Sequence, residues 1–145
     1  MVLLAGGKLL SRYYVLGLNC EPCLSQTLFL VSKGSQPERG DYVAFRFLVP
    51  GDRYHPYGQV FVKRVAGRSG DLLQVQGRDF WLNGSWLGEA REQDSQGRQV
   101  GHFAWVGPVP GGKFFALGDG LASYDSRYWG FVDETWVIGR ATPLI

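Results

Sequence analysis

The stretch "VFVKRVAGRSGDLLQVQGRDFWLNG", residues 60–84, decides the fold. It contains three short runs of β-branched, aromatic and other apolar residues, 60–66, 72–76 and 79–82, and each run is bounded by residues that favour turns. Its last two residues, Asn83-Gly84, favour a tight type I′ hairpin, because both central positions of that turn need a positive φ. The stretch therefore predicts antiparallel strands joined by short turns.

Short apolar runs continue on both sides of this stretch. The 145 residues include 21 glycines and seven prolines, and no window of twelve or more residues carries a sustained helical repeat of apolar residues. Further strands are predicted at residues 13–18, 27–32, 42–47, 114–117 and 137–142. The polar segment 89–101 is predicted to be an exposed loop or long hairpin tip. The fold class is therefore mainly β, with antiparallel β-sheets, a long hairpin and few short helices.

Composition and charge limit the classes of function. The length is that of one ordinary domain, and with 45% hydrophobic residues the chain can bury one core. The net charge is only +2, and the lysines are scattered rather than gathered in a basic run with interleaved aromatic residues. Nucleic-acid binding needs such a basic groove, so no nucleic-acid partner is expected.

The two cysteines, Cys20 and Cys23, form a single C-x-x-C pair. A structural zinc site needs four ligands, and only His55 and His102 are available to complete this pair, so no metal and no other cofactor is expected. A thioredoxin-like redox pair would be followed by a long helix, whereas the residues after Cys23 predict a strand. A redox function is therefore the less favoured interpretation of the pair.

The N-terminal residues are apolar but include Lys8 and Arg12. A helix that spans a membrane needs about 20 consecutive, predominantly apolar residues, and this segment falls short of that length. Two interpretations remain open. The segment is either a first strand at residues 13–18 with a tail before it, or the remnant of a membrane anchor.

Three segments together carry the candidate chemistry: "EPCLSQTLFLV" at 21–31, "GQVFVKRVAGRSGD" at 58–71 and "LGDGLASYDSRYWGFV" at 117–132. In this order they resemble the motifs of the serine/lysine signal peptidases, and in particular those of the conjugative-transfer (TraF-type) pilin peptidases. The resemblance implies β-sheets of the signal peptidase type. It also implies a catalytic domain at residues 20–145, after an N-terminal segment, 1–19, that is a candidate anchor remnant.

The first segment departs from the family's pattern, in which a serine is the nucleophile. When Cys23-Leu24-Ser25-Gln26-Thr27-Leu28 is aligned with the family's Ser-Met-x-Pro-Thr-Leu, Cys23 takes the nucleophile position. Ser25 is the alternative nucleophile, but in a strand a shift of two residues moves a side chain by about 7 Å. Glu21 stands where some signal peptidases have a serine that helps to bind the oxyanion, and a carboxylate can donate a hydrogen bond only when it is protonated.

The other two segments supply the remaining site residues. By resemblance, Lys63 is the catalytic base, Ser123 forms a hydrogen bond with its amine, and Asp125 and Arg127 pair to support the loop beneath it. A lysine is a base only when it is neutral, so its pKa must fall from about 10.4 toward about 7, which burial against apolar side chains can cause. With Cys23 as nucleophile, Lys63 either takes the thiol proton during attack or forms an ion pair with a thiolate.

The resemblance implies an endopeptidase that cleaves a leader or pilin precursor after small residues, through an acyl-enzyme, in conjugative transfer. Its partner would be an exported precursor polypeptide, met at the membrane surface on the periplasmic face of the bacterial inner membrane. Two alternatives stay open: a catalytically inactive binding or assembly module with the same fold, and the redox protein. An unpaired strand edge near 27–32 or 113–117 is predicted to bind the substrate in extended form.

Overall fold

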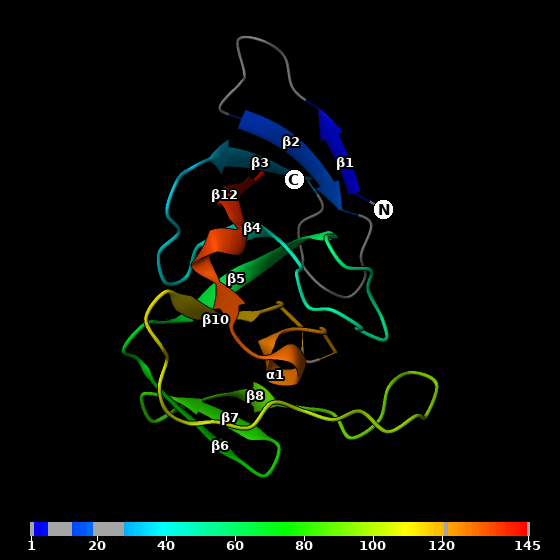
Figure 1. Ribbon diagram of the computed structural model, residues 1–145, viewed down its shortest axis with the longest axis vertical. Helices are drawn as coiled ribbons and strands as arrows, with labels where there is room; N and C mark the ends of the chain where they lie inside the picture. The colour runs from blue at the N-terminus through cyan, green and yellow to red at the C-terminus, as the bar shows by residue number, and fades with distance from the viewer. Residues whose placement is uncertain (1, 6–12, 19–27, 121, 145) are drawn as a thin grey trace.

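The computed structural model describes residues 2–5, 13–18, 28–120 and 122–144. Within this part of the chain the strands form two antiparallel sheets, one above the other in Figure 1. The larger sheet has the strand order β1-β2-β3-β12-β4-β5-β10-β11, and the smaller sheet has the order β8-β7-β6-β9. The prediction of a mainly antiparallel β fold is confirmed.

The strands of the larger sheet are β1 (Val2–Ala5), β2 (Tyr13–Leu18), β3 (Leu28–Lys33), β4 (Tyr42–Arg46), β5 (Val60–Arg68), β10 (Lys113–Leu117), β11 (Val132–Asp133) and β12 (Val137–Pro143). Those of the smaller sheet are β6 (Leu72–Gln76), β7 (Asp79–Leu82), β8 (Ser85–Glu89) and β9 (Val106–Pro108). The described helices are short: α1 (Ser126–Trp129) and the 3-10 turn η2 (Glu134–Trp136). None of the helices in the described part of the chain has the length and apolar character needed to cross a membrane.

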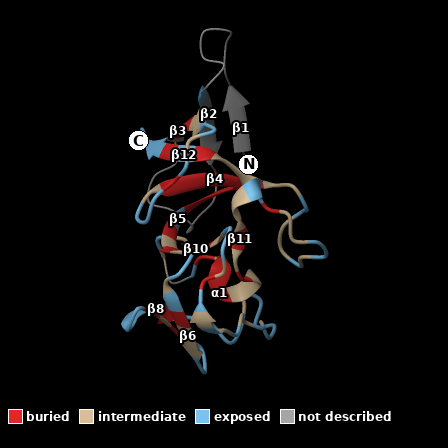
Figure 2. Cartoon of the chain, turned by 60° about the vertical axis from the view of Figure 1, so that its left-hand side comes forward, coloured by how far each residue is buried: buried red, intermediate tan, exposed pale blue. Residues whose placement is uncertain are grey.

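Strand β5 is the centre of the fold, and its side chains alternate between two buried clusters. Val60 and Val62 pack with residues of β3, β4 and β12. Phe61 and Val65 pack on the opposite face with aromatic residues that follow or belong to β4 and β10. Because Lys63 lies between Phe61 and Val65 in this alternation, its side chain emerges on their face, which also carries α1. Figure 2 shows the buried residues concentrated along the central strands.

The two sheets approach each other closely at Gly67. A third buried cluster, which includes Leu73, Phe80 and Phe115, joins β10 of the larger sheet to β6 and β7 of the smaller one. A Cβ atom at Gly67 would lie 2.9 Å from Cδ1 of Leu82, so the glycine is what permits this contact. The smaller sheet is thus packed directly against the strands that form the candidate site.

The predicted hairpin at Asn83-Gly84 is present. Leu82 of β7 pairs with Ser85 of β8, so the loop has two residues. Asn83 has φ 49° and Gly84 has φ 84°, both in the left-handed region that a type I′ turn requires. The turn could be predicted because it depends only on the two adjacent residues Asn83 and Gly84.

All eight predicted strands are present, with bounds within two residues of those predicted, although residue 27 lies outside the described residues. Strands β1, β8, β9 and β11 were not predicted. Most of them are short, β8 and β9 contain glycine, and β11 has only two residues. Segment 89–101 is mostly exposed, as predicted, and is closed by a bridge between Gln93 and Gln99.

The unpaired edge predicted at 27–32 is wrong, because β3 lies between β2 and β12. The edge predicted at 113–117 is covered by β11 only at Lys113 and Phe114, so in the described structure residues 115–117 pair with a strand on one side only. The neighbours β11 and β12 come from the end of the described chain, so the pairing could not be inferred from the local sequence.

Another edge, which was not predicted, is also open. β4 pairs with β5 as far as Val60, whereas the pairing of β10 with β5 stops at Arg64, so in the described structure residues 60–63 of β5 pair with a strand on one side only.

Candidate active site

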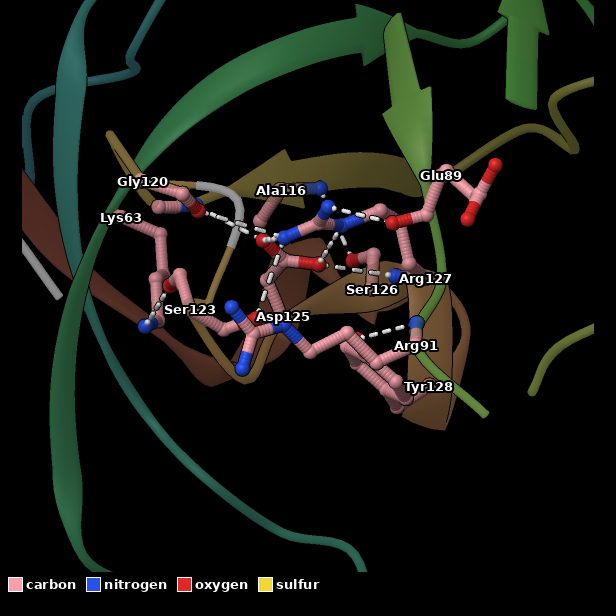
Figure 3. Close-up of polar contacts among 11 residues, drawn as sticks. Lys63, Glu89, Arg91, Ala116, Gly120, Ser123, Asp125, Ser126, Arg127 and Tyr128 are labelled. Carbon is pink, nitrogen blue, oxygen red and sulfur yellow. Dashed lines mark hydrogen bonds and ion pairs between the residues drawn. The ribbon is translucent and has the colours of Figure 1, made fainter. Parts of the chain in front are cut away.

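Lys63 is buried in the larger sheet and its amine meets the loop that follows β10. The residue pairs with Val43 of β4, and only 3% of its surface is exposed. Its Nζ donates a hydrogen bond to Oγ of Ser123, over 3.1 Å, and lies 5.6 Å from the centre of the Phe61 ring. Sixty residues separate the two partners of this hydrogen bond, and it is drawn in Figure 3. The contact between Lys63 and Ser123 that the resemblance implied is present.

Burial changes the acid-base behaviour of this amine. It lowers the pKa of Lys63 from 10.5 to about 8, since an ammonium ion loses its hydration inside the sheet. The negative charge of Asp125 acts in the opposite direction, and the positive charge of Arg127 adds to the lowering. With a pKa of about 8, about a tenth of the lysine is neutral at pH 7, whereas an unperturbed lysine would be almost entirely protonated.

A buried ion pair holds the loop that carries Ser123. Nε of Arg127 donates to Oδ1 of Asp125 over 2.8 Å, and Nη2 donates to Oδ2 over 2.9 Å, so the pair is bidentate. Neither side chain is more than 3% exposed. Burial acts to lower the pKa of Arg127, but the paired carboxylate outweighs it and the pKa is raised. Such a planar, two-bond contact fixes both distance and orientation.

The ion pair also ties the loop to its surroundings (Figure 3). Arg127 donates to the backbone carbonyl oxygens of Ser123, at 3.1 Å, and of Glu89 at the end of β8, at 3.0 Å. The Asp125 carboxylate accepts from the backbone N–H of Gly118, at 3.0 Å, and caps helix α1. The loop is therefore fastened to both sheets, and the position of the Ser123 hydroxyl is fixed.

A second polar group, which sequence reasoning did not identify, surrounds Arg64 in the middle of β5. Arg64 forms an ion pair with Asp119, with 3.3 Å between Nε and Oδ1. Tyr42 donates to the same carboxylate over 3.0 Å, and Arg64 contacts both the Tyr42 hydroxyl and the Gly40 carbonyl oxygen. Arg64 and Asp119 stand inside the motif segments, whereas Gly40 and Tyr42 do not. Their contacts join β4, β5 and the loop after β10, which no local pattern shows.

The structure brings together only part of the predicted site. Lys63, Ser123, Asp125 and Arg127 meet in one buried group, as the motif order suggested. The predictions on Cys20, Glu21, Cys23 and Ser25 fall on residues outside the described part of the chain.

The comparisons with known proteins agree with this geometry. The sequence profile of the family described as "Signal peptidase, peptidase S26" matches residues 1–145. The chain belongs to this family. Among curated signal peptidases, one from Leptolyngbya laminosa is 38% identical over 107 residues, which is 72% of this chain and 51% of that protein. One from Bacillus caldolyticus is 32% identical over 146 residues, covering 90% of this chain and 76% of the relative.

A solved structure shows the same fold. The signal peptidase I from Enterococcus faecalis is 27% identical, with a TM-score of 0.50, over 74% of this chain and 98% of that one. Membership of the S26 signal peptidase family therefore rests on both sequence and fold. The chain spans about half the length of two curated relatives, 51% of the protein from Leptolyngbya laminosa and 46% of a probable signal peptidase I-2 from Synechocystis sp..

Proposed function

We propose that this member of the signal peptidase family is an endopeptidase that cleaves exported precursor polypeptides after small residues, through an acyl-enzyme. The observation that carries the proposal is the buried Lys63 amine, with its pKa lowered to about 8 and its Nζ hydrogen-bonded to Ser123. Burying a lysine lowers its pKa and costs folding free energy, and residues with strongly perturbed pKa values are concentrated at functional sites. The relatives named signal peptidase I support the same reaction class.

In the proposed mechanism, the side chain of Cys23 attacks the carbonyl carbon of the scissile peptide bond. Neutral Lys63 takes the proton from the nucleophile, the C–N bond breaks, and the lysine ammonium gives its proton to the departing amine. Lys63 is then neutral again and takes a proton from the water that attacks the acyl carbon. The acyl–sulfur bond breaks, and Lys63 returns this proton to the sulfur of Cys23. If Ser25 is the nucleophile instead, the same proton transfers apply to its hydroxyl.

The supporting residues have distinct roles in this proposal. Ser123 restrains the amine through its hydroxyl, so that Nζ points along one direction. Asp125 and Arg127 act through Ser123, because Arg127 holds the backbone carbonyl of that residue. They are positioning residues, and the amine of Lys63 is the group that handles the proton.

The open edge of β5 at residues 60–63 supports binding of an extended substrate. A substrate strand can add to such an edge through backbone hydrogen bonds. The edge leads directly to Lys63, so a peptide bound along it brings one of its peptide bonds to the amine. The proposed substrate edge is therefore residues 60–63 of β5, and not the edge at 27–32 that the sequence suggested.

The finer assignment is to a TraF-type pilin peptidase of conjugative transfer, acting on the periplasmic face of the inner membrane. It rests on the motif resemblance in segments 58–71 and 117–132. In this assignment the catalytic residues belong to a domain at residues 20–145, and β1 and β2 extend its larger sheet. The acyl-enzyme is resolved either by water or by an amine of the same substrate, which would give a cyclic product.

A second candidate function is an inactive binding or assembly module. The observation in its favour is the departure of the first segment, where Cys23 and Glu21 replace the family's serines. The supporting group around Lys63 would then be retained only as part of the fold.

The test is cleavage of a pilin-precursor peptide, together with intact-mass detection of a covalent acyl adduct. The proposal expects cleavage by the wild type, and none by Cys23→Ala or by Lys63→Met. An adduct on Ser25 would transfer the nucleophile role to that residue. No cleavage by either wild type or Cys23→Ser would favour the module, and thiol-disulfide exchange that survives Lys63→Met would favour the redox protein.

A further inference from the structure

A pocket of about 330 Å³ is lined in part by Ser123, the residue that accepts the hydrogen bond from Lys63. Its walls include Tyr54, His55, Asp94, Tyr124 and Tyr128, and we call it the tyrosine pocket. The walls come from three segments that lie on the same side of the molecule in Figure 1: the loop between β4 and β5, segment 89–101 and the loop after β10. Its volume is at the lower end of the range for binding pockets.

Hydrogen bonds between these segments fix the shape of the pocket. The Tyr54 hydroxyl donates to Oδ2 of Asp94 over 2.7 Å, and the Tyr124 hydroxyl donates to Oδ1 of Asp52 over 2.6 Å. The rings of Tyr54 and Tyr124 meet at 4.9 Å, and Tyr124 stacks on Tyr128 at 5.3 Å. The aromatic wall is therefore formed before any ligand arrives.

The Asp94 carboxylate at the wall has no acceptor site left for a ligand, whereas the Arg91 guanidinium leaves a positive charge there. The hydrogen bond from Tyr54 leads the effects that lower the pKa of Asp94 to about 2. This carboxylate also accepts from the backbone N–H groups of Gln96 and Arg98 and from Nε of Arg98. These four bonds fill its acceptor sites. The pocket thus offers ring faces with one positive charge at the wall, which suits a large apolar or aromatic side chain and not a basic one.

The pocket is continuous with the proposed site. Ser123 lines it and accepts the hydrogen bond from Lys63. The His55 ring packs at 4.8 Å against Phe61, the ring beside the lysine amine. Burial is the main cause that lowers the pKa of His55, and the Lys63 charge acts in the same direction, so the wall carries little charge from this ring near neutral pH.

The path of a bound peptide leads to this pocket. A peptide that adds to residues 60–63 of β5 cannot continue along the strand, because β10 occupies that edge from Arg64 onward. Beyond Lys63 the peptide must turn away, and the loop that carries Ser123 stands at that point. The tyrosine pocket is lined in part by this serine.

From this geometry we propose that the tyrosine pocket binds a large apolar or aromatic side chain of the substrate, among the first residues after the cleaved bond. The proposal rests on the peptidase function above. It adds a specificity determinant for the part of the substrate that follows the scissile bond. This part leaves as an amine, which Lys63 protonates.

The experiment compares peptides that share one sequence before the scissile bond and differ only in the first two residues after it. With phenylalanine or leucine there, kcat/KM is expected to be about tenfold higher than with alanine. Lysine is expected to give no gain over alanine, because no acceptor is free. The full chain is used throughout.

Two variants test the pocket itself. Ser95→Trp, at the pocket wall, should fill the space and bring the ratio of phenylalanine to alanine substrates close to one. Tyr54→Ala should lower the same ratio, whereas Tyr57→Ala should not change it. Tyr57 is the matched control, since it lies on the same loop, is 64% exposed and does not line the pocket. Thermal unfolding checks that each variant is folded.

The outcomes separate this proposal from the one it rests on. Equal kcat/KM for phenylalanine and alanine peptides in the wild type would overturn the pocket proposal and leave the peptidase intact. A preference that persists unchanged in Ser95→Trp would overturn it as well. Failure to cleave any peptide would remove both proposals together.

Discussion

Replacing Lys63 with methionine should make the protein more stable while removing its activity. Burial lowers the pKa of this lysine from 10.5 to about 8, which corresponds to about 3 kcal/mol. Below pH 8 the lysine is charged in both the folded and unfolded states, so the fold carries the whole cost of burying the ion. Methionine removes that cost but leaves Ser123 without its donor, a loss of about 1 kcal/mol. The net gain expected at pH 7 is about 2 kcal/mol.

The pH dependence gives a sharper form of this prediction. Between pH 8 and pH 10.5 the unfolded lysine still holds a proton that the folded one has lost, so wild-type stability should rise with pH in this window. The methionine variant lacks this term, so its advantage of about 2 kcal/mol should vanish at about pH 9.5 and become a disadvantage of about 1 kcal/mol above pH 10.5. Urea unfolding of both proteins at pH 7, 9 and 10.5 measures the difference directly.

An exposed lysine provides the control for this experiment. Lys113 is 40% exposed and pairs with Asp133 over 3.1 Å. Lys113→Met should therefore cost about 0–1 kcal/mol and give no stabilisation at pH 7. If Lys63→Met is less stable than the wild type at pH 7, or if its advantage does not change with pH, the account of a costly buried amine is refuted.

Three further predictions concern the loop and the sheet. Ser123→Ala should lower kcat by about 10²-fold, because the lysine amine loses its restraint, and should cost about 1.5–3 kcal/mol in urea unfolding, because the buried ammonium loses its acceptor; an unchanged kcat in a peptide-cleavage assay would contradict this. Asp125→Asn should cost about 3–5 kcal/mol in urea unfolding, since it leaves the Arg127 charge buried without its partner; a loss under about 1 kcal/mol would show that the pair is not a structural support. Gly139→Ala should destabilise the protein strongly, because its Cβ would lie 1.9 Å from the Ser32 carbonyl oxygen, whereas Gly111→Ala has open space and should be tolerated; equal melting temperatures for the two would refute the clash.

The strands could be predicted because their signals are local. Apolar runs such as 60–66 and 79–82 carry enough β-branched and aromatic residues to mark a strand without knowledge of its neighbours. The turn at Asn83-Gly84 is equally local. Strand β9 was missed because a glycine and a proline weaken the pattern in only three residues.

Sheet order could not be predicted in the same way. The edge assigned to 27–32 is covered by β12, and the start of 113–117 is covered by β11, and nothing in either segment indicates those neighbours. The burial of the candidate site could not be predicted from the local sequence either. Residue statistics favour an exposed Lys63, and only the order of three motifs pointed to its burial. The pocket beside it needs three separate loops, so no single segment carried a signal for it.

The position of β12 has a consequence for how the protein is made. Strand β12, residues 137–143, lies between β3 and β4 and pairs with both. These two strands are therefore joined in one sheet only after the last part of the described chain has been synthesised. A nascent chain on the ribosome can form the β6–β7–β8 meander early, but it cannot unite the two halves of the large sheet. The larger sheet is therefore completed only after translation has passed residue 143, so residues 28–33 must wait for the end of the described chain to join the strands around Lys63.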